Sequence, residues 1–530
     1  MLYRSAIQWW LLLKPKLTVG RLAVSTGVEM GVTPSAEQPK LASGALNLSA
    51  VFFHTLSYMA PVGGLVYSVQ YPAVQAGTSL GLAYVFATFA CLLTALCLKE
   101  LVRKVRSSGG YFVMHSVALG HFAGFTTSWL WFIYAGLLPA SQCLLWGAVT
   151  SEFLAIELGI AIPWWVFAVV MATTLTAVTY VGIKQSARLT TILGITEAVV
   201  FGALGLILVF KAGSNQPLVT FTPAASPNGM SGVMFAMIFG IFCFMGFEGG
   251  LPLAEESHNA KRSLTFTVVA SIGFMGLFSC FMVYATIAGW GNYRDGAAFA
   301  QEFGAANQPF FTLAHKAFGP IGPTIMLLLI TNTVWAGAIA GTNAVTRVYY
   351  SLGRAGVFPK ALAHADPKHK TPVNAILLAG SIALLLPFVF GMGIGVTPIV
   401  AYGLLGVVMT TGAVVIYMMT NVGCFLLYWR KYRDEFHPMH HLIIPVVSTV
   451  VFIAPLIAVL RPQWLSLLGL PSLSHEYPIS LAPPIVAVWG TIGFVFYLYL
   501  SKFKVQVLTN MSEEMAHIEL VGEEGNRGRS

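Results

Sequence analysis

Charge is scarce in this chain. Only 9% of its 530 residues are charged, whereas 56% are hydrophobic. Soluble domains carry about 25% charged residues, so the composition excludes a soluble globular protein and predicts a chain that crosses a membrane many times. The net charge of +9 does not indicate a nucleic-acid partner, because the basic residues gather in a few loops between apolar runs.

Cysteine is scarce as well. All six cysteines fall inside apolar runs and lack the spacing of a metal site: Cys91, Cys97, Cys143, Cys243, Cys280 and Cys424. Such cysteines behave as small hydrophobic residues, and we expect neither disulfides nor a metal site. No nucleophile–base cluster or metal-ligand cluster lies at membrane depth. We therefore expect no enzyme activity. The expected partners are a small-molecule substrate and the lipid bilayer, and the oligomeric state stays open.

Long apolar runs are the dominant feature that is present. Twelve of them reach the length of about 20 residues that a helix needs to cross the hydrocarbon core. The predicted fold class is therefore an all-α polytopic membrane protein with about twelve transmembrane helices. The predicted spans are residues 46–70, 78–103, 121–150, 163–183, 188–211, 232–256, 263–290, 320–350, 372–392, 397–429, 441–461 and 481–502.

Basic residues predict the orientation. An even number of spans places both termini on one side, and Lys and Arg concentrate on the cytoplasmic side of membrane proteins. With cytoplasmic termini, the outer loops hold four of the 29 basic residues, and the inner loops and tails hold the other 25. We expect a protein of the plasma (inner) membrane with an N-terminal tail over 1–45, beginning at Met1 or Met30, and a C-terminal tail over 503–530.

Two of the predicted spans are interrupted by glycine and proline. The first, within Leu46–Pro72, has Ala60-Pro61-Val62-Gly63-Gly64 at its centre, and the second, within Met234–Glu256, has the sequence GFEGG from Gly246 to Gly250. Irregular backbone persists at membrane depth only where it lines a cavity or is buried in protein. A pair of such breaks in matching spans favours a transporter with inverted repeats. The alternative is an ordinary packing kink, because Gly and Pro are common in membrane helices.

Two loops on opposite predicted sides of the membrane each contain a short helical pattern. Ser107–Gly120, on the predicted inner side, and Gln308–Pro320, on the predicted outer side, each read as a short surface helix. Spans 1–5 (residues 46–211) and 6–10 (residues 232–429) are therefore expected to form a 5+5 inverted repeat, each copy opening with a broken helix. Residues 441–502, which hold spans 11 and 12, stand outside the repeat.

Three motifs in order resemble the amino acid–polyamine–organocation superfamily, in its bacterial amino acid permease branch. They are FMGFEGGLPLAEES at Phe244–Ser257, SGGYF at Ser108–Phe112, and TRVYYSLGRAGVFPKAL at Thr346–Leu362. The break at Ala60–Gly64 is also similar to that branch, and the matches cover residues 46–430. Ala260 stands where the family usually has Pro, and Ala355 where an acidic residue is common; both departures fall in inner loops.

The resemblance implies a secondary transporter of amino acids that works by alternating access without a cofactor. The substrate's carboxylate and ammonium groups would meet exposed backbone at the two breaks, where half-helix ends attract charge. Phe242 would close over the substrate, although packing alone also explains an aromatic residue there. The binding residues carried over by motif position are Ala60, Pro61, Val62, Gly63, Gly64, Phe242, Cys243, Phe244 and Gly246.

Two carboxylates at membrane depth are functional candidates, because a charge there costs roughly 2.5–3.5 kcal/mol. Glu197 lies near the centre of the fifth span, where proton-coupled members of the family often carry Lys. We expect it to exchange protons as the cavity opens, the alternative being a structural acid. Glu248 lies at the second break and is assigned to substrate binding. Alternatively, it holds a proton or pairs with the freed backbone amides of the break. Glu255 and Glu256 are expected to be gate or surface charges.

Other polar and aromatic residues carry weaker expectations. His54 is expected to be a packing residue, whereas Asn332 and Trp335 are candidates to line the cavity. A carrier of cationic amines, of the polyamine or ethanolamine type, is the alternative function, since Glu197 and Glu248 suit a cation. A nutrient sensor without transport is a further alternative. Coupling to protons, coupling to sodium and plain exchange all stay open.

The charge distribution makes the topology testable. A cysteine introduced at Ser107 or Thr371 should react with a membrane-impermeant maleimide only from the cytoplasmic side. A cysteine at Gly213 or Ala306 should react from outside. Labelling is measured in intact cells and in inverted vesicles, with the unsubstituted chain as the control for the native thiols. Reaction of the Ser107 variant in intact cells would contradict the predicted orientation.

Overall fold

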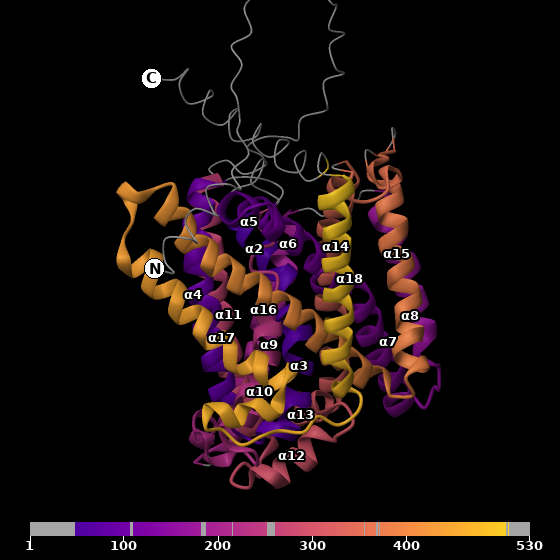
Figure 1. Ribbon diagram of the computed structural model, residues 1–530. Coiled ribbons are helices and arrows are strands. Elements are labelled where there is room, and N and C mark those ends of the chain that lie inside the picture. Colours follow the sequence, from indigo (N-terminus) through magenta and orange to yellow (C-terminus); the bar gives the residue numbers. More distant parts are fainter. Residues whose placement is uncertain are drawn as a thin grey trace, which may run out of the picture. The chain divides into compact units, whose positions relative to one another are not determined.

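The computed structural model describes residues 48–504 and 507, apart from 106–109, 182–186, 215, 252–259, 355, 367–368 and 370. The described part consists of helices and connecting turns, without strands (Figure 1), which confirms the all-α prediction. The predicted tail over 1–45, most of the tail over 503–530, and Glu255 and Glu256 lie outside the described residues.

The long helices agree with the predicted spans to within a few residues at most ends. The bundle in Figure 1 comprises α2 (Leu48–Met59), α3 (Pro61–Ala76), α4 (Leu80–Lys104), α5 (Tyr111–Leu119), α6 (His121–Tyr134), α7 (Leu138–Glu157), α8 (Trp164–Val181), α9 (Ala187–Ala212), α10 (Gly229–Phe244), α11 (Ala260–Trp290), α12 (Gly296–Gly304), α13 (Pro309–Phe318), α14 (Gly322–Arg354), α15 (Val373–Phe388), α16 (Pro398–Arg430), α17 (Ile444–Leu460) and α18 (Ala482–Phe503).

Ten helical stretches of the described residues are long and apolar enough to cross a membrane, which identifies a multi-pass membrane protein. The two predicted spans outside that set are the interrupted ones. The first is divided into α2 and α3, of 12 and 16 residues, and α10, of 16 residues, ends at Phe244 within the second. Each piece is shorter than a full span at ~1.5 Å rise per residue. The breaks therefore shorten the helices where the sequence placed Gly and Pro.

The helices with breaks lie together in the bundle. α10 packs extensively against both α3 and α4, and α4 in turn packs against α11. α9 lies against α2, and α14 lies against α2, α3 and α7. The two interrupted segments, which lie about 180 residues apart in the sequence, thus pack side by side, so side chains of one can contact the break of the other.

Short helices occur in both loops that were predicted to carry them. α5 lies within 107–120 and α13 within 308–320. The sequence reading missed α12, a helix of nine residues before α13. Its N-terminus is capped by Asp295, whose carboxylate accepts hydrogen bonds from the amides of Ala297 and Ala298, both at 3.0 Å. An Asp directly before a helix is a recognisable N-cap signal.

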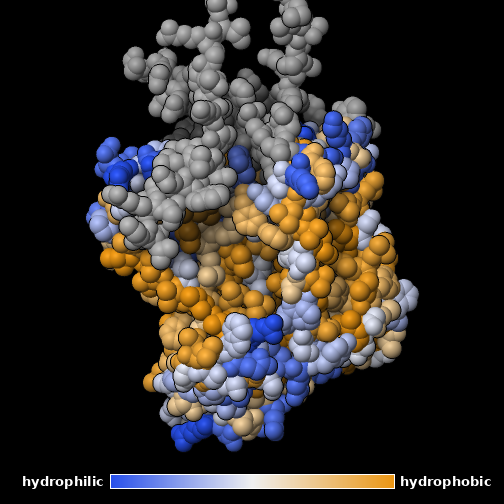
Figure 2. Space-filling view, in the orientation of Figure 1, coloured by the Kyte–Doolittle hydropathy of each residue, from blue (hydrophilic) through white to orange (hydrophobic). Residues whose placement is uncertain are grey.

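Hydrophobic residues cover the middle of the face shown in Figure 2, and more hydrophilic residues lie at both of its ends. The helices that contribute fully exposed apolar side chains include α9 and α11, where Phe210 is 83% exposed and Leu277 is 79% exposed. Many exposed apolar side chains on long apolar helices are typical of a surface that faces lipid. The described surface therefore agrees with the composition.

Candidate functional site

The first break is a single residue in a left-handed conformation. Ala60, between α2 and α3, has a φ of 48°, which costs a residue other than glycine about 1–3 kcal/mol. Pro61 follows as the first residue of α3. It lacks an N–H and disfavours a helical conformation in the residue before it. The Ala60-Pro61 pair therefore ends α2 and starts α3 afresh, and the first amides of α3 lack partners within the helix.

Glu197 of α9 binds the start of α3. One carboxylate oxygen accepts a hydrogen bond from the Val62 amide at 3.0 Å, and the other accepts one from the Asn332 side chain of α14 at 3.1 Å. The Glu197 side chain is buried. The first amides of a helix form its positive end, so the anion at this end of α3 is the protein's own carboxylate. No partner for Glu197 is evident from the neighbouring sequence, and the fold supplies two.

The second break follows α10. Residues 245–250 form a series of turns, and Gly246 has a φ of 99°. A Cβ at this position would lie 2.7 Å from the Tyr58 ring, so only glycine fits. The Gly246 amide donates a hydrogen bond to the Tyr134 hydroxyl at 3.2 Å, and that hydroxyl donates to Glu248. The freed backbone of this break is thus also tied to a carboxylate, through a tyrosine.

A cavity of about 30 Å³ lies between the two breaks. A buried water needs about 10–15 Å³ of such space, so the cavity has room for about two. Its lining comes from six helices and from the turns after α10, and comprises Tyr58, Met59, Gly64, Tyr134, Ala135, Leu138, Gln142, Phe242, Met245, Gly246, Tyr402 and Met409. We call this space the central cavity.

Three of the predicted binding residues line the central cavity: Gly64, Phe242 and Gly246. The others lie beside it. A Cβ on Gly63 would meet Thr333 of α14 at 3.0 Å, so this glycine allows close helix packing, and Val62 binds Glu197. Among the remaining residues, Ala60, Cys243 and Phe244 are buried in the surrounding packing, Pro61 borders a cavity described below, and Glu248 lines the cavity next to the central one.

Sequence reasoning missed most of the central lining. Tyr134, Gln142 and Tyr402 come from α6, α7 and α16, and none of them stands in a break or a charged motif. The Gln142 carbonyl oxygen is buried without a hydrogen-bond partner among the described residues, which makes it available to a ligand. A buried glutamine in an apolar run was the one signal that the sequence offered.

Aromatic rings close the central cavity on the side of α3. Phe242 packs edge-to-face on Tyr402 with ring centroids 6.0 Å apart, and Tyr402 packs in the same way on Tyr67 at 4.6 Å. Contacts of this geometry add about 0.5–1.5 kcal/mol per pair beyond burial. Phe242 thus lines the central cavity, and its closing over the substrate stays a prediction. Trp335, a candidate for the cavity, instead packs on Trp146 at 5.3 Å.

Two further cavities adjoin this site. One, of about 60 Å³, contains Tyr58 and Glu248 in its lining, and we call it the inner cavity. The other, of about 210 Å³, is lined mainly by apolar side chains of α2, α9 and α11 and also reaches Pro61 and Glu197. Its lining includes Val199, which is 63% exposed, so this cavity lies at an exposed apolar surface of the bundle.

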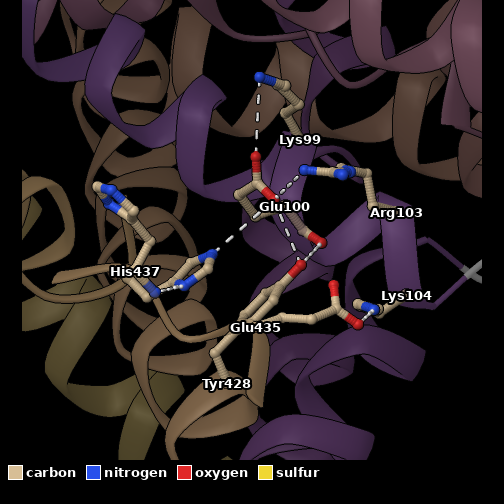
Figure 3. A network of polar contacts seen from close by, with 8 residues as sticks. Lys99, Glu100, Arg103, Lys104, Tyr428, Glu435 and His437 are labelled. Atoms are coloured by element: carbon tan, nitrogen blue, oxygen red, sulfur yellow. Dashed lines mark hydrogen bonds and ion pairs between the residues drawn. The ribbon is translucent and has the colours of Figure 1, made fainter. Parts of the chain in front are cut away.

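A charged cluster ties α4 to α16 and to the short helical segment Met439–Ile443 before α17, away from the cavities (Figure 3). Glu100 of α4 is buried and accepts hydrogen bonds from Arg103 at 2.9 Å and from the Tyr428 hydroxyl at 3.3 Å. Lys99 lies 3.7 Å from the same carboxylate, and the His441 ring lies 3.9 Å from it. A buried carboxylate with these partners has its charge compensated, so this cluster fixes the end of α4.

An exposed ion pair extends the same contact. Lys104 donates to the Glu435 carboxylate at 2.5 Å and lies 4.3 Å above the Tyr432 ring. The hydrogen bond from Lys104 holds the pKa of Glu435 below its ordinary value. Because the pair lies in water, it contributes little stability. It marks where the loop after α16 meets α4.

Comparison with known proteins agrees with the geometry. A family model described as amino acid permease matches residues 46–496. The chain is 27% identical over 487 residues to the low-affinity putrescine importer PlaP of Escherichia coli (strain K12), covering 89% of this chain and 96% of that protein. It is 27% identical over 343 residues to the branched-chain amino acid permease BcaP of Bacillus subtilis (strain 168), covering 59% and 68%. The aromatic amino acid permease FywP of Lactococcus lactis is 25% identical over 423 residues, covering 75% and 87%.

The glycines of the central cavity give a direct test of the site. A Cβ on Gly64 would lie 3.7 Å from Cys243, which is an ordinary contact, so Gly64→Ala should be tolerated, whereas the longer side chain in Gly64→Leu fills the cavity. We expect Gly64→Leu to lower uptake of radiolabelled amino acids and amines more than tenfold at an unchanged level of protein in the membrane.

Gly273→Leu is the matched control, because a Cβ there meets nothing within 4 Å. Normal uptake by Gly64→Leu would place the binding site elsewhere. Gly246→Leu should be more damaging than Gly64→Leu, since its backbone conformation disfavours any side chain and Tyr58 blocks the space.

Proposed function

The chain belongs to the amino acid permease family of the amino acid–polyamine–organocation superfamily, and we propose that it is a secondary active transporter that moves amino acids across the bacterial plasma membrane by alternating access. The proposal includes twelve spans in a 5+5 inverted repeat with two additional helices, and both termini in the cytoplasm. The family and its named members are permeases, and the ten apolar helices of the described chain support a multi-pass membrane protein.

The observation that carries the proposal is the meeting of the two breaks at one cavity. Gly64 after the first break and Gly246 within the second both line the central cavity, and a half-helix end with freed backbone groups is a ready site for charged substrate groups. The central cavity is smaller than an amino acid. Substrate binding there therefore requires Tyr58, Phe242 or Tyr402 to move, which is the change that alternating access needs.

Glu197 is our candidate for coupling. Its carboxylate holds the Val62 amide and the Asn332 side chain, so its protonation state acts directly on the first break. A carboxylate that gains a proton accepts more weakly from an amide, and the start of α3 is then free to attract the carboxylate of a substrate. Proton binding and substrate binding would in this way favour one another.

A carrier of cationic amines is the second candidate. The central lining contains no Lys or Arg among the described residues. The N-terminal end of α3 already binds the Glu197 carboxylate, and Glu248 lies close by. One relative, of which the alignment with this chain covers 96%, is named a putrescine importer. Uptake of radiolabelled L-amino acids and putrescine by the purified protein in liposomes separates the two candidates.

Glu197→Gln tests the coupling role. Gln mimics the protonated acid and its amide oxygen can still accept from Val62, so the protein should fold and exchange substrate across the membrane. Accumulation driven by a proton gradient should be lost. The measurement compares counterflow with gradient-driven uptake in the same liposomes, and Glu302→Gln, at an exposed position on α12, serves as the control.

Glu248→Gln is expected to behave differently. That residue lies at the second break and accepts from Tyr134, so its neutral variant should weaken binding, and counterflow should fall together with driven uptake. If Glu197→Gln still concentrates substrate under a proton gradient, Glu197 is structural and sodium coupling or exchange is the better account.

A further inference from the structure

The inner cavity contains polar atoms that the fold leaves without partners. Glu248 is 2% exposed, and although one of its oxygens accepts from Tyr134, the other has no hydrogen-bond partner among the described residues. The hydroxyl of Tyr111, which is also 2% exposed, and the indole N–H of Trp131 are likewise unpartnered within the described chain. All three residues line the inner cavity. Buried polar groups are nearly always paired, so three around one cavity point to a ligand.

The chemistry of these atoms defines the ligand. The free Glu248 oxygen is an acceptor, whereas the Trp131 indole is a donor only and the Tyr111 hydroxyl can donate. Arg347 of α14 lines the same cavity and carries a guanidinium, which matches the geometry of a carboxylate. The cavity thus offers an anionic acceptor for an ammonium group and a set of donors for a carboxylate.

Aromatic rings strengthen the ammonium side. Tyr111 and Trp131 have ring centroids 6.3 Å apart, and Tyr58 also lines the cavity. The faces of Trp and Tyr rings attract cations. A volume of about 60 Å³ exceeds that needed for one water about fourfold, which is enough space for the charged end of a small molecule.

We propose that the inner cavity is a second substrate site, which holds a zwitterionic amino acid with its ammonium group at Glu248 and its carboxylate at Trp131 and Arg347. The inference rests on the proposed transport function and refines it. A diamine would leave the Trp131 donor unpaired and place a positive charge near Arg347, and an anion would face Glu248. Only a molecule with both charges satisfies the whole lining.

The position of the inner cavity gives the site its role. Tyr58 lines both the inner and the central cavity, and Arg347 lies near the end of α14 that the charge pattern assigns to the cytoplasm. A substrate that leaves the central cavity past Tyr58 enters the inner cavity next. The site is therefore used on the cytoplasmic side of the transport cycle and not at first binding from outside.

The test uses the full-length protein in liposomes of measured orientation, with the twenty L-amino acids of proteins and putrescine as probes. Tyr111→Phe removes only the unpartnered O–H, whereas Trp131→Phe removes the unpartnered N–H together with part of a ring that packs on Tyr134. For the amino acid with the fastest uptake, each should raise the half-saturating concentration from the cytoplasmic side about three- to tenfold, the effect of one hydrogen bond. The value from the outer side should stay within twofold. Arg347→Gln should act in the same direction and more strongly.

Tyr349→Phe is the matched control, because the Tyr349 hydroxyl is also buried and unpartnered but lies outside the inner cavity. If Tyr111→Phe and Trp131→Phe behave like this control while amino acid transport persists, the inner site is disproved and the proposed function stands. Equal shifts from both sides would also disprove it. If the unsubstituted protein moves only putrescine, the zwitterion assignment is wrong, and if it moves no probe, the proposed function itself fails.

Discussion

The need to satisfy backbone hydrogen bonds away from water governs this structure. A continuous helix meets the need within itself, and each break releases amides and carbonyls that must find other partners. In this chain the partners are side chains from other helices. The Val62 amide donates to Glu197, and the Gly246 amide donates to Tyr134, whose hydroxyl in turn donates to Glu248. Each break is therefore held by a buried carboxylate, directly in one case and through a tyrosine in the other.

The two buried acids link the breaks to neighbouring helices. A carboxylate that holds a break cannot change its protonation or its partners without changing the backbone beside the central cavity. The bonds of Glu197 reach both α3 and α14, so under the proposed coupling a proton on this residue would alter the contact between a break and a helix that has none. The Tyr134–Glu248 pair connects α6 to the second break. A change at either acid would in that case reach the elements that border the central cavity.

The sequence predicted the fold well because hydrophobic length is a local property. The ends of α4, α8, α11 and α16 agree with the predicted spans to within a few residues, and the breaks appear where Pro61 and Gly246 interrupt apolar runs. The short helix α12 was missed, since its apolar pattern is brief, although Asp295 marked its start.

The site was predicted only in part because its lining depends on tertiary packing. Gly64, Phe242 and Gly246 carry motif signals and line the central cavity. Tyr134 and Gln142 are ordinary residues of apolar helices, and nothing local indicates that α6 and α7 turn them towards the breaks. Glu197 was recognised from its cost in a membrane, yet its partners Val62 and Asn332 are each 135 residues away in sequence. Pairing at such separation is a property of the folded bundle.

The two sides of the central cavity are closed by different physical means. Towards the predicted outer side, Phe242, Tyr402 and Tyr67 form a layer of ring contacts. Small rotations of the side chains separate these rings, and each lost contact costs little free energy. Towards the predicted inner side, Tyr58 stands beside Gly246, and the Tyr134–Glu248 hydrogen bond joins α6 to the break. Opening on this side breaks the buried hydrogen bond between Tyr134 and Glu248, so Glu248 then needs another polar partner. In the proposed transport cycle, a substrate that brings its ammonium group to Glu248 would supply that partner, and the charged end of the substrate would then lower the barrier on the side where it leaves.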